Sequence, residues 1–456
     1  MLSKEQKTKL DRGLKDYASS LNVPGLALVI SKGKDRVYEY YHGYRDVENR
    51  LPVTGETVFG LASITKSFAS LAIMQLAERG LLSVHDPVQK WIPNFKLPGG
   101  RASGEVQIHH LMTHSAGLPG LPTVHQARLG SLLQDPDGRE LFGDDSLFDK
   151  KQISSVEELV EELAKEEVEL LGEPGEIFNY SNESYALLQK IIEVTSGRDF
   201  LDYMEENIFL ALQMERSSFL SEDLEDLEPV TEIYAYRDGE YFPSPTWWDV
   251  GQIYTNGSLK ASAYDLAKYG QMLAQGGQGI LSEESLALMT KPHIETPNGV
   301  SYGYGFTVDE GEGLSSFGHG GGIKGVSSYL LVVPEQEISI VVLINIAEAP
   351  AENVARIALR KVLDLAEPEV EYESVQLSKE ELAIYAGEYA SKEGQTASIR
   401  QGKSYIKLVA GNLTIKLQSI GNHHFLTPEG KRITFIVENG LVKGIFRGLR
   451  YIEKLG

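Results

Sequence analysis

A serine and a lysine stand one helical turn apart at the head of a strongly apolar stretch, "FGLASITKSFAS", residues 59–70. Ser63 and Lys66 would share one face of a helix, because positions i and i+3 are neighbours on a helix surface. Burial disfavours an ammonium group and lowers the pKa of a lysine toward that of a useful base. Such a lysine can activate a hydroxyl as a nucleophile, and amides at a helix N-terminus can stabilise an oxyanion. The alternative is a serine helix cap with a lysine on the solvent face.

Two later stretches add polar side chains of the kinds that assist a serine nucleophile. Tyr180 and Asn182 flank Ser181 in "PGEIFNYSNESYALLQKII", just before a predicted helix. His319 precedes three glycines and a β-rich run in "FGHGGGIKGVSSYL", where glycines let another backbone approach closely. Each has a structural alternative, since Asn182 suits a helix cap, Tyr180 suits a core, and the glycines suit a loop before an edge strand.

The three motifs become specific when they are taken together. Ser-x-x-Lys, Tyr-x-Asn and His-Gly-Gly follow one another in that order along the chain. Over residues 10–365 the sequence resembles the serine β-lactamase and penicillin-binding-protein superfamily, especially the branch of class C β-lactamases, D-aminopeptidases and family VIII esterases. The phrases "TVFGLASITKSF", "VQIHHLMTHSAGL" and "PEQEISIVVLIN" carry the same resemblance. Related enzymes use a Ser-x-x-Lys pair for acylation.

The resemblance implies a role for each residue of the first two motifs. Ser63 would be the acylated nucleophile, Lys66 would help to deprotonate it, and Tyr180 would be a partner base that passes the proton to the leaving group. Asn182 would hold the acyl-side amide of the substrate and orient the lysine. The backbone amides of Ser63 and Gly322 would form the oxyanion hole.

The sequence departs from the lactamase pattern at the third motif. His319, Gly320 and Gly321 stand where many members have Lys-Thr-Gly, and the resemblance implies that they bind substrate. The change removes a hydroxyl group and a permanent cation that could bind a substrate carboxylate. It argues against carboxypeptidase and efficient β-lactamase activity, and it favours the aminopeptidase, amidase or esterase substrates of family members with His-x-Gly.

We therefore expect a serine hydrolase that cleaves small peptides through an acyl-enzyme at Ser63, with D-residues as one expected preference. An esterase or β-lactam hydrolase with the same machinery is the first alternative. The second is a sensor of β-lactams or peptides, in which Ser63 is acylated but not released. The resemblance implies no cofactor.

Other polar and aromatic clusters are interpreted as packing. His110 and His114 lie four residues apart in "HHLMTH", and we expect them to pack near the following turn rather than to bind metal. Trp247, Trp248 and Tyr254 could wall the pocket, but core packing is the favoured interpretation. No metal site is predicted.

The composition limits the partners of the chain. A formal charge of −22 over 456 residues argues against nucleic acid and anionic membranes. The absence of cysteine excludes disulfides and thiolate metal sites. The N-terminal "MLSKEQKTKLDRGL" is polar, and no apolar stretch reaches the roughly 20 residues of a membrane span, which favours a cytoplasmic location.

The elements that must position the motifs predict an α/β (α+β) domain over residues 1–365. β-rich runs near both ends predict one antiparallel sheet of about five strands. Helical periodicity between residues 60 and 290 predicts helices that flank this sheet and an inserted helical lobe. Residues 121–152 have weak periodicity and predict a long loop of the kind that forms lids. The predicted helices cover residues 63–79, 154–170, 184–196, 199–208, 263–275, 283–290 and 350–365.

The C-terminal part predicts a second domain. Residues 366–378 are acidic with little periodicity and predict a linker. Eight short β-rich runs within residues 379–456 predict a small all-β antiparallel barrel. This part resembles the lipocalin-like module of some of these enzymes. The two-part layout resembles the archaeal octameric CubicO-type serine peptidases, which implies a homo-oligomer and suggests an octamer.

The charge of the C-terminal part suggests how it sits on the body. Residues 373–456 hold 12 Lys and Arg against 8 Asp and Glu, whereas the rest of the chain is strongly acidic. Opposite charges predict that the barrel docks on an acidic body. All the motif residues lie outside the barrel, so we expect its removal to spare acylation of a small ester.

Overall fold

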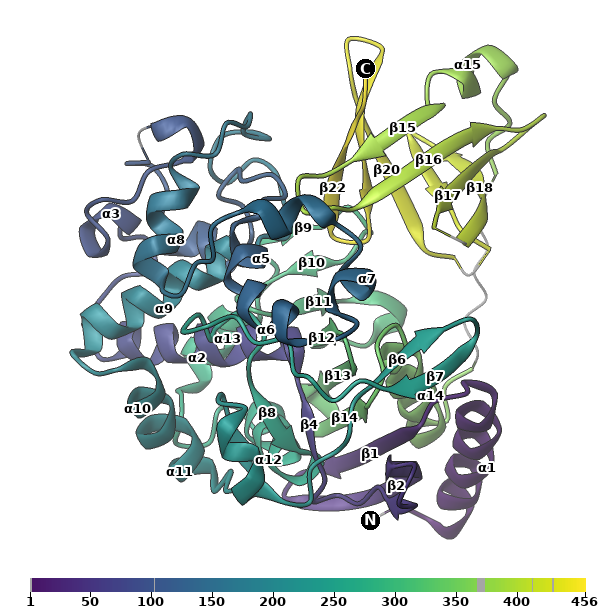
Figure 1. The fold of residues 1–456 in the computed structure, drawn as a ribbon. Coiled ribbons are helices and arrows are strands. Elements are labelled where there is room, and N and C mark those ends of the chain that lie inside the picture. Colours follow the sequence, from purple (N-terminus) through teal and green to yellow (C-terminus); the bar gives the residue numbers. More distant parts are fainter. Residues whose placement is uncertain (1, 102, 367–373, 412, 429) are drawn as a thin grey trace.

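A large antiparallel sheet organises the first part of the chain (Figure 1). The computed structural model describes residues 2–101, 103–366, 374–411, 413–428 and 430–456. Within these residues the sheet has nine strands in the order β3-β2-β1-β14-β13-β12-β11-β10-β9. Their bounds are β1 Gly25–Lys32, β2 Asp35–Asp46, β3 Leu51–Pro52, β9 Ile294–Glu295, β10 Ser301–Tyr302, β11 Thr307–Asp309, β12 Ser316–Ile323, β13 Val326–Val333 and β14 Ile338–Ile344.

Four of the five predicted strands correspond to β1, β2, β13 and β14, and the fifth predicted run, residues 302–308, contains parts of β10 and β11. The long strand β12 was not predicted, because four of its eight residues are glycines and carry little β pattern. The edge strands β3 and β9 were missed because each has only two residues. The antiparallel sheet flanked by helices is confirmed.

Helices cover both faces of the sheet, and strand alternation divides its apolar residues between two cores. In β1, Leu26 and Leu28 pack into one core with residues of α1 and α14, whereas Ala27 and Val29 pack into the other with α2 and α12. Both sets are buried, so the strand is a continuous apolar run. These helices span α1 Lys4–Ser20, α2 Thr65–Glu78, α12 Ala263–Ala274 and α14 Ala351–Leu363.

The helical lobe is built around α2, whose residues from Thr65 to Leu76 are all buried. Helix α9, Asn182–Ser196, packs directly against α2. Small strand pairings connect the lobe to the sheet: β4 Val58–Gly60, β5 Ser217–Ser218 and β8 Lys260–Ser262 form one, and β6 Tyr234–Arg237 and β7 Glu240–Pro243 another. The remaining α-helices are α3 Val88–Trp91, α4 Ile108–Met112, α5 Thr123–Ala127, α6 Leu129–Gln134, α7 Gly138–Phe142, α8 Val156–Leu163, α10 Phe200–Met204, α11 Leu210–Leu212 and α13 Glu283–Thr290.

The prediction of a loop over residues 121–152 was wrong. The segment forms α5, α6 and α7, followed by a 3-10 helix at Asp145–Asp149. Leu129, Leu132 and Leu147 are buried in a small cluster of their own, against which Trp248 packs. Each helix has only five or six residues, too few to show a helical repeat in the sequence.

The C-terminal barrel was predicted correctly. Its eight described strands pair in sequence order, and the barrel closes where β15 pairs with β22. Most of the predicted linker, residues 367–373, lies outside the described residues. The elements are α15 Lys379–Ala383, β15 Gly387–Ala390, β16 Thr396–Gln401, β17 Ile406–Ala410, β18 Leu413–Gly421, β19 His424–Leu426, β20 Arg432–Glu438, β21 Leu441–Arg447 and β22 Arg450–Lys454.

The barrel rests on the β9–β10 edge of the sheet and on the lobe (Figure 1). Arg432 donates a 2.8 Å hydrogen bond to the carbonyl of Pro297 and lies 3.2 Å from a Glu295 carboxylate oxygen. Lys392 donates to the carbonyl of Glu167 at 2.6 Å. Basic side chains of the barrel therefore meet the body, but mainly at its backbone carbonyls. Among the described helices none has the length and apolar character that a membrane span requires.

Candidate active site

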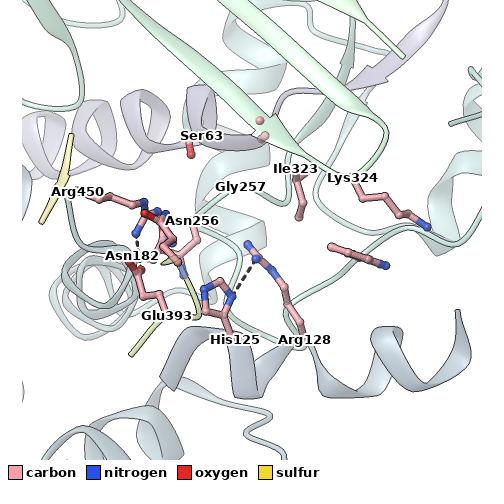
Figure 2. Close-up of a pocket in the computed structure, with 14 residues that line it drawn as sticks. Ser63, His125, Arg128, Asn182, Asn256, Gly257, Ile323, Lys324, Glu393 and Arg450 are labelled. Atoms are coloured by element: carbon pink, nitrogen blue, oxygen red, sulfur yellow. Dashed lines mark hydrogen bonds and ion pairs between the residues drawn. The ribbon is translucent and has the colours of Figure 1, made fainter. Parts of the chain in front are cut away.

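A pocket of about 320 Å³ lies where the lobe, the end of β12 and the barrel meet (Figure 2). Three parts of the chain that are far apart in sequence contribute its walls. The lining residues are Ala62, Ser63, His125, Arg128, Asn182, Trp248, Asn256, Gly257, Gly322, Ile323, Lys324, Glu393, Gln395 and Arg450.

Ser63 stands on a sharply turned segment between β4 and α2. Ala62, just before it, has a φ of +46°, a left-handed conformation that is unfavourable for a residue with a Cβ. The turn is held by Leu61, whose amide donates to Leu259 at 2.8 Å and whose carbonyl accepts the Ser328 hydroxyl at 2.7 Å. Ser63 is thereby placed at the pocket wall while the residues around it are buried.

Lys66 is fully buried, and its amine meets three partners. The Nζ atom lies 2.9 Å from Asn182 Oδ1, 2.7 Å from the carbonyl oxygen of Asn256 and 3.3 Å from Ser63 Oγ. Burial first, and then the positive charges of Arg450 and Arg128, hold the pKa of Lys66 well below its usual value. Both influences favour the neutral amine over the ammonium form of Lys66.

The direction of the hydrogen bond between Lys66 and Ser63 depends on the protonation state of Lys66 and on its other two partners. A neutral amine has two N–H donors and one lone pair. Asn182 Oδ1 and the Asn256 carbonyl can only accept, so they take the two N–H groups. In the neutral form the lone pair is left for the third partner and can accept the Ser63 hydrogen, whereas the ammonium form donates to Ser63 Oγ. The neutral form gives the arrangement of a nucleophile and its general base.

Tyr180 lies beside this pair. Its hydroxyl is buried and has no hydrogen-bond partner of regular geometry in the described part of the chain. Burial raises the pKa of Tyr180 to about 12, although the nearby Ser63 hydroxyl and the Arg450 guanidinium offset part of the rise. The phenol is therefore protonated at neutral pH. The Lys66 amine lies 4.9 Å from the centre of its ring.

His114 supports the Tyr180 segment. Its ring packs 4.2 Å from the Tyr180 ring, and its Nδ1 accepts the Ser181 amide at 3.0 Å. Burial holds the pKa of His114 well below its usual value, so the ring is neutral and able to accept. The prediction that His114 packs near the turn is confirmed, and its ring contacts those of Tyr180, Tyr185, Phe178 and Tyr302.

Two asparagine side chains present amides to the pocket. Asn182 turns its Oδ1 toward Lys66, so its Nδ2 group remains to donate to a ligand. Asn256 lines the same wall, and both polar atoms of its side-chain amide are buried without a partner among the described residues. Asn256 was not among the predicted site residues, although the Asn-Gly pair in "YTNGSLK" could have indicated a tight turn there.

The third motif lies behind the pocket wall, and only the residue that follows it, Gly322, reaches the pocket. His319 is buried and does not line the pocket; its Nε2 is 2.9 Å from the Tyr302 hydroxyl, and burial lowers its pKa to about 3. Gly320 and Gly321 also lie off the pocket wall. A Cβ on Gly321 would lie 2.1 Å from the Leu61 carbonyl oxygen, so this glycine lets β12 approach the Ser63 turn. Gly322 does line the pocket, together with Ser63.

The sequence prediction missed the charged residues of the pocket. His125 and Arg128 come from the α5–α6 segment, and Glu393 and Arg450 come from the barrel. Arg450 forms an ion pair with Glu393 and lies 4.9 Å from the centre of the Tyr180 ring. In the sequence they are four isolated polar residues, and only the fold brings them together.

The aromatic residues Trp248 and Tyr254 lie in different environments. Trp248 lines the pocket, where its Nε1 donates to Asp135 at 2.8 Å. Tyr254 instead packs beside Phe200 and Phe219, as core packing predicts.

The family model described as Beta-lactamase matches residues 10–364, and the chain belongs to this family. Its members are serine hydrolases of the β-lactamase and penicillin-binding-protein type. The resemblance that the three motifs carry is thus confirmed.

Comparisons with individual proteins agree with this family assignment. The chain is 25% identical over 410 residues to penicillin-binding protein 4* of Bacillus subtilis (strain 168), covering 86% of this chain and 85% of that protein. It matches the octameric penicillin-binding protein homologue from Pyrococcus abyssi with a TM-score of 0.69 and 30% identity, over 98% of this chain and 99% of that one. A D-stereospecific amidohydrolase from Streptomyces sp. shares the fold, with a TM-score of 0.62 and 23% identity over 79% of this chain and 99% of that one.

Proposed function

We propose that this protein is a serine hydrolase that cleaves short peptides and amino-acid amides through an acyl-enzyme at Ser63. The observation that carries the proposal is the buried Lys66 amine, which contacts Asn182 Oδ1, the Asn256 carbonyl oxygen and Ser63 Oγ. Burial favours its neutral form, in which two N–H groups serve the asparagines and the lone pair is left for Ser63.

The proposed reaction has two halves. Ser63 Oγ attacks the substrate carbonyl while its proton passes to Lys66, and the backbone amides of Ser63 and Gly322 hold the oxyanion. The bond to the leaving group then breaks as Tyr180 gives its proton to the leaving amine and regains one from Lys66. Water adds to the acyl ester in the second half, which releases the acid and restores the Ser63 hydroxyl. Asn182 Nδ2 holds the acyl-side amide of the substrate.

The pocket supports small substrates. Its volume of about 320 Å³ and its cover by the barrel residues Glu393 and Arg450 leave room for a few residues rather than a folded chain. The fold is shared with a D-stereospecific amidohydrolase, and D-configured residues are accordingly included in the proposed substrates. The match along nearly the whole chain to an octameric homologue supports a homo-oligomer, which light scattering would measure.

Labelling with a fluorophosphonate probe tests the nucleophile, and mass spectrometry should find the adduct on the peptide that contains Ser63. A set of matched D- and L-dipeptide amides and esters then tests the substrate. Turnover that Ser63→Ala abolishes supports the hydrolase. A single equivalent of product followed by a stable adduct would instead indicate a sensor, and turnover of esters without amides would indicate an esterase.

A further inference from the structure

Among the described residues, one cation of the pocket, Arg128, has no acidic partner within ion-pair distance. Arg128 Nη1 donates to His125 Nδ1 at 3.2 Å, and Arg128 Nε is buried without a partner among the described residues. Burial first, and then the charge of Arg128, keep the pKa of His125 well below its usual value, so this partner is neutral. The part of the chain that the structure describes offers Arg128 no ion pair. In Figure 2 its side chain points toward the middle of the pocket.

The other charges of the pocket are matched. Glu393 is paired with Arg450, and Asp135 lies 2.5 Å from Lys324 Nζ. Figure 2 shows Arg450 on one side of the pocket and Lys324 on the other, with Arg128 between them. Neither carboxylate is left over for Arg128.

One more acid acts electrostatically on Arg128 but does not supply the missing charge in full. Glu183 is buried and accepts hydrogen bonds from the Thr123 hydroxyl and the Val124 amide. Burial raises its pKa to about 7, so a large fraction is protonated at neutral pH. The pocket thus carries excess positive charge although the whole chain has a formal charge of −22.

We propose that Arg128 is a substrate-binding residue that takes a free carboxylate of the substrate. This inference rests on the proposed function and specifies its substrate class. A guanidinium binds a carboxylate through parallel N–H donors, which a partly desolvated Arg128 with an unpartnered Nε can provide. The third motif has no permanent cation at position 319, and Arg128 would supply one from the α5–α6 segment.

A competing possibility is recognition of a substrate ammonium group. Glu393 also lines the pocket, and its Oε2 is buried without a partner among the described residues. The carboxylate is already neutralised by Arg450, whereas no described residue forms an ion pair with Arg128, so the observations favour an anionic ligand.

The test uses two matched pairs of activated esters, because a free carboxylate can stand on either side of the scissile bond. The leaving-group pair is the phenylacetylglycyl ester of 3-hydroxybenzoate and that of 3-hydroxybenzamide. The acyl-side pair is the phenyl ester of N-succinylglycine and that of its succinamide analogue. The readout is the ratio of kcat/KM for carboxylate over carboxamide within each pair.

The wild-type protein should prefer the carboxylate in at least one pair by about tenfold or more, as expected for a charge-assisted hydrogen bond. Arg128→Gln should bring that ratio close to one, and Arg128→Lys should restore part of it. The matched control is Arg139→Gln, since Arg139 is exposed in the same segment and pairs with Asp145; its ratio should equal that of the wild type. Thermal melts check that each variant folds.

Two results would overturn the inference. One is a ratio near one in both pairs that Arg128→Gln leaves unchanged. The other is a preference for glycine 4-nitroanilide over its N-acetyl form that Glu393→Gln removes, because the pocket would then bind an ammonium group.

A binding measurement separates this inference from the proposed function. Calorimetry compares N-phenylacetylglycine with its amide on Ser63→Ala and on Ser63→Ala/Arg128→Gln. The subsite is supported if N-phenylacetylglycine binds more tightly than its amide and if this difference depends on Arg128. That result would stand even if no ester is turned over, in which case only the hydrolase proposal fails. Equal binding of acid and amide counts against the subsite.

Discussion

The backbone amide of Tyr180 donates a 3.0 Å hydrogen bond to the carbonyl oxygen of Leu449, which ties the segment of a proposed proton carrier to a turn of the barrel. The preceding residue is tied to the same turn, since the Tyr451 amide donates to Asn179 Oδ1 at 2.8 Å. Arg450, between the two barrel residues, reaches the Tyr180 ring. The barrel therefore contributes to the site, and its removal should slow acylation, in contrast to the expectation from the positions of the motifs alone.

A chain that ends at residue 366 should react with a fluorophosphonate about 100-fold more slowly than the full chain, because small misplacements of catalytic groups have effects of this size. The labelling rate of Ser63 is the measurement, and a thermal melt checks that the truncated body folds. Asn179→Ala is a milder form of the same change, since it removes the acceptor of the Tyr451 amide. A folded truncation that is labelled at the full rate would show that the barrel does not position the site.

The sequence was informative where chemistry or packing leaves a local pattern. Ser63 and Lys66 share one helical turn, and the barrel strands alternate, so both could be predicted. Arg128 and Arg450 could not, because they are more than 300 positions apart and meet only through tertiary structure. Gly321 was assigned to the substrate from its motif, whereas its position is explained by the close approach of the Leu61 carbonyl.

Arg450→Gln should move the acid limb of the kcat/KM profile to higher pH. Burial and then the Arg450 charge lower the pKa of Lys66, so removal of that charge raises this pKa. Lys66 must be deprotonated to act as a base, and activity would therefore begin at higher pH. The profile of a neutral activated ester gives the limb, with exposed Lys443→Gln in the same barrel as the control. A limb that moves equally in both variants would point to a general charge effect rather than a local one.

Glu183→Gln should remove a pH dependence of stability. Burial raises the pKa of Glu183 to about 7 in the folded protein from 4.5, so the folded state keeps a proton that the unfolded chain has lost between these values. Stability from this group is complete below about pH 4.5 and falls as the pH rises toward 7, by about 3 kcal/mol. Glutamine can still accept from Thr123 and Val124.

Urea unfolding of the wild type, Glu183→Gln and the exposed control Glu161→Gln at pH 4.5, 6 and 8 measures this effect. The free energy of unfolding of Glu183→Gln should rise relative to the wild type as the pH increases, whereas that of Glu161→Gln should follow the wild type. Parallel curves for Glu183→Gln and the wild type would mean that Glu183 titrates in the folded protein as it does in the unfolded chain.

An added methyl group should destabilise the fold at Gly321 but not at Gly322, the next residue of β12. A Cβ on Gly321 would lie 2.1 Å from the Leu61 carbonyl oxygen and 2.3 Å from Ser328 Oγ, whereas a Cβ on Gly322 would meet no atom within 4 Å. Gly321→Ala must therefore displace the turn that carries Ser63, and we expect it to destabilise the fold by about 1–3 kcal/mol, the usual effect of overpacking.

The measurements are the free energy of unfolding and the rate at which Ser63 reacts with a fluorophosphonate. Gly321→Ala should lower both, because the Leu61 carbonyl also accepts the Ser328 hydroxyl that holds the turn. Gly322→Ala should keep the wild-type free energy of unfolding to within about 0.5 kcal/mol, since its methyl group enters open space at the pocket wall. If Gly321→Ala were as stable and as reactive as the wild type, the close approach of β12 to Leu61 would not be what fixes the position of Ser63.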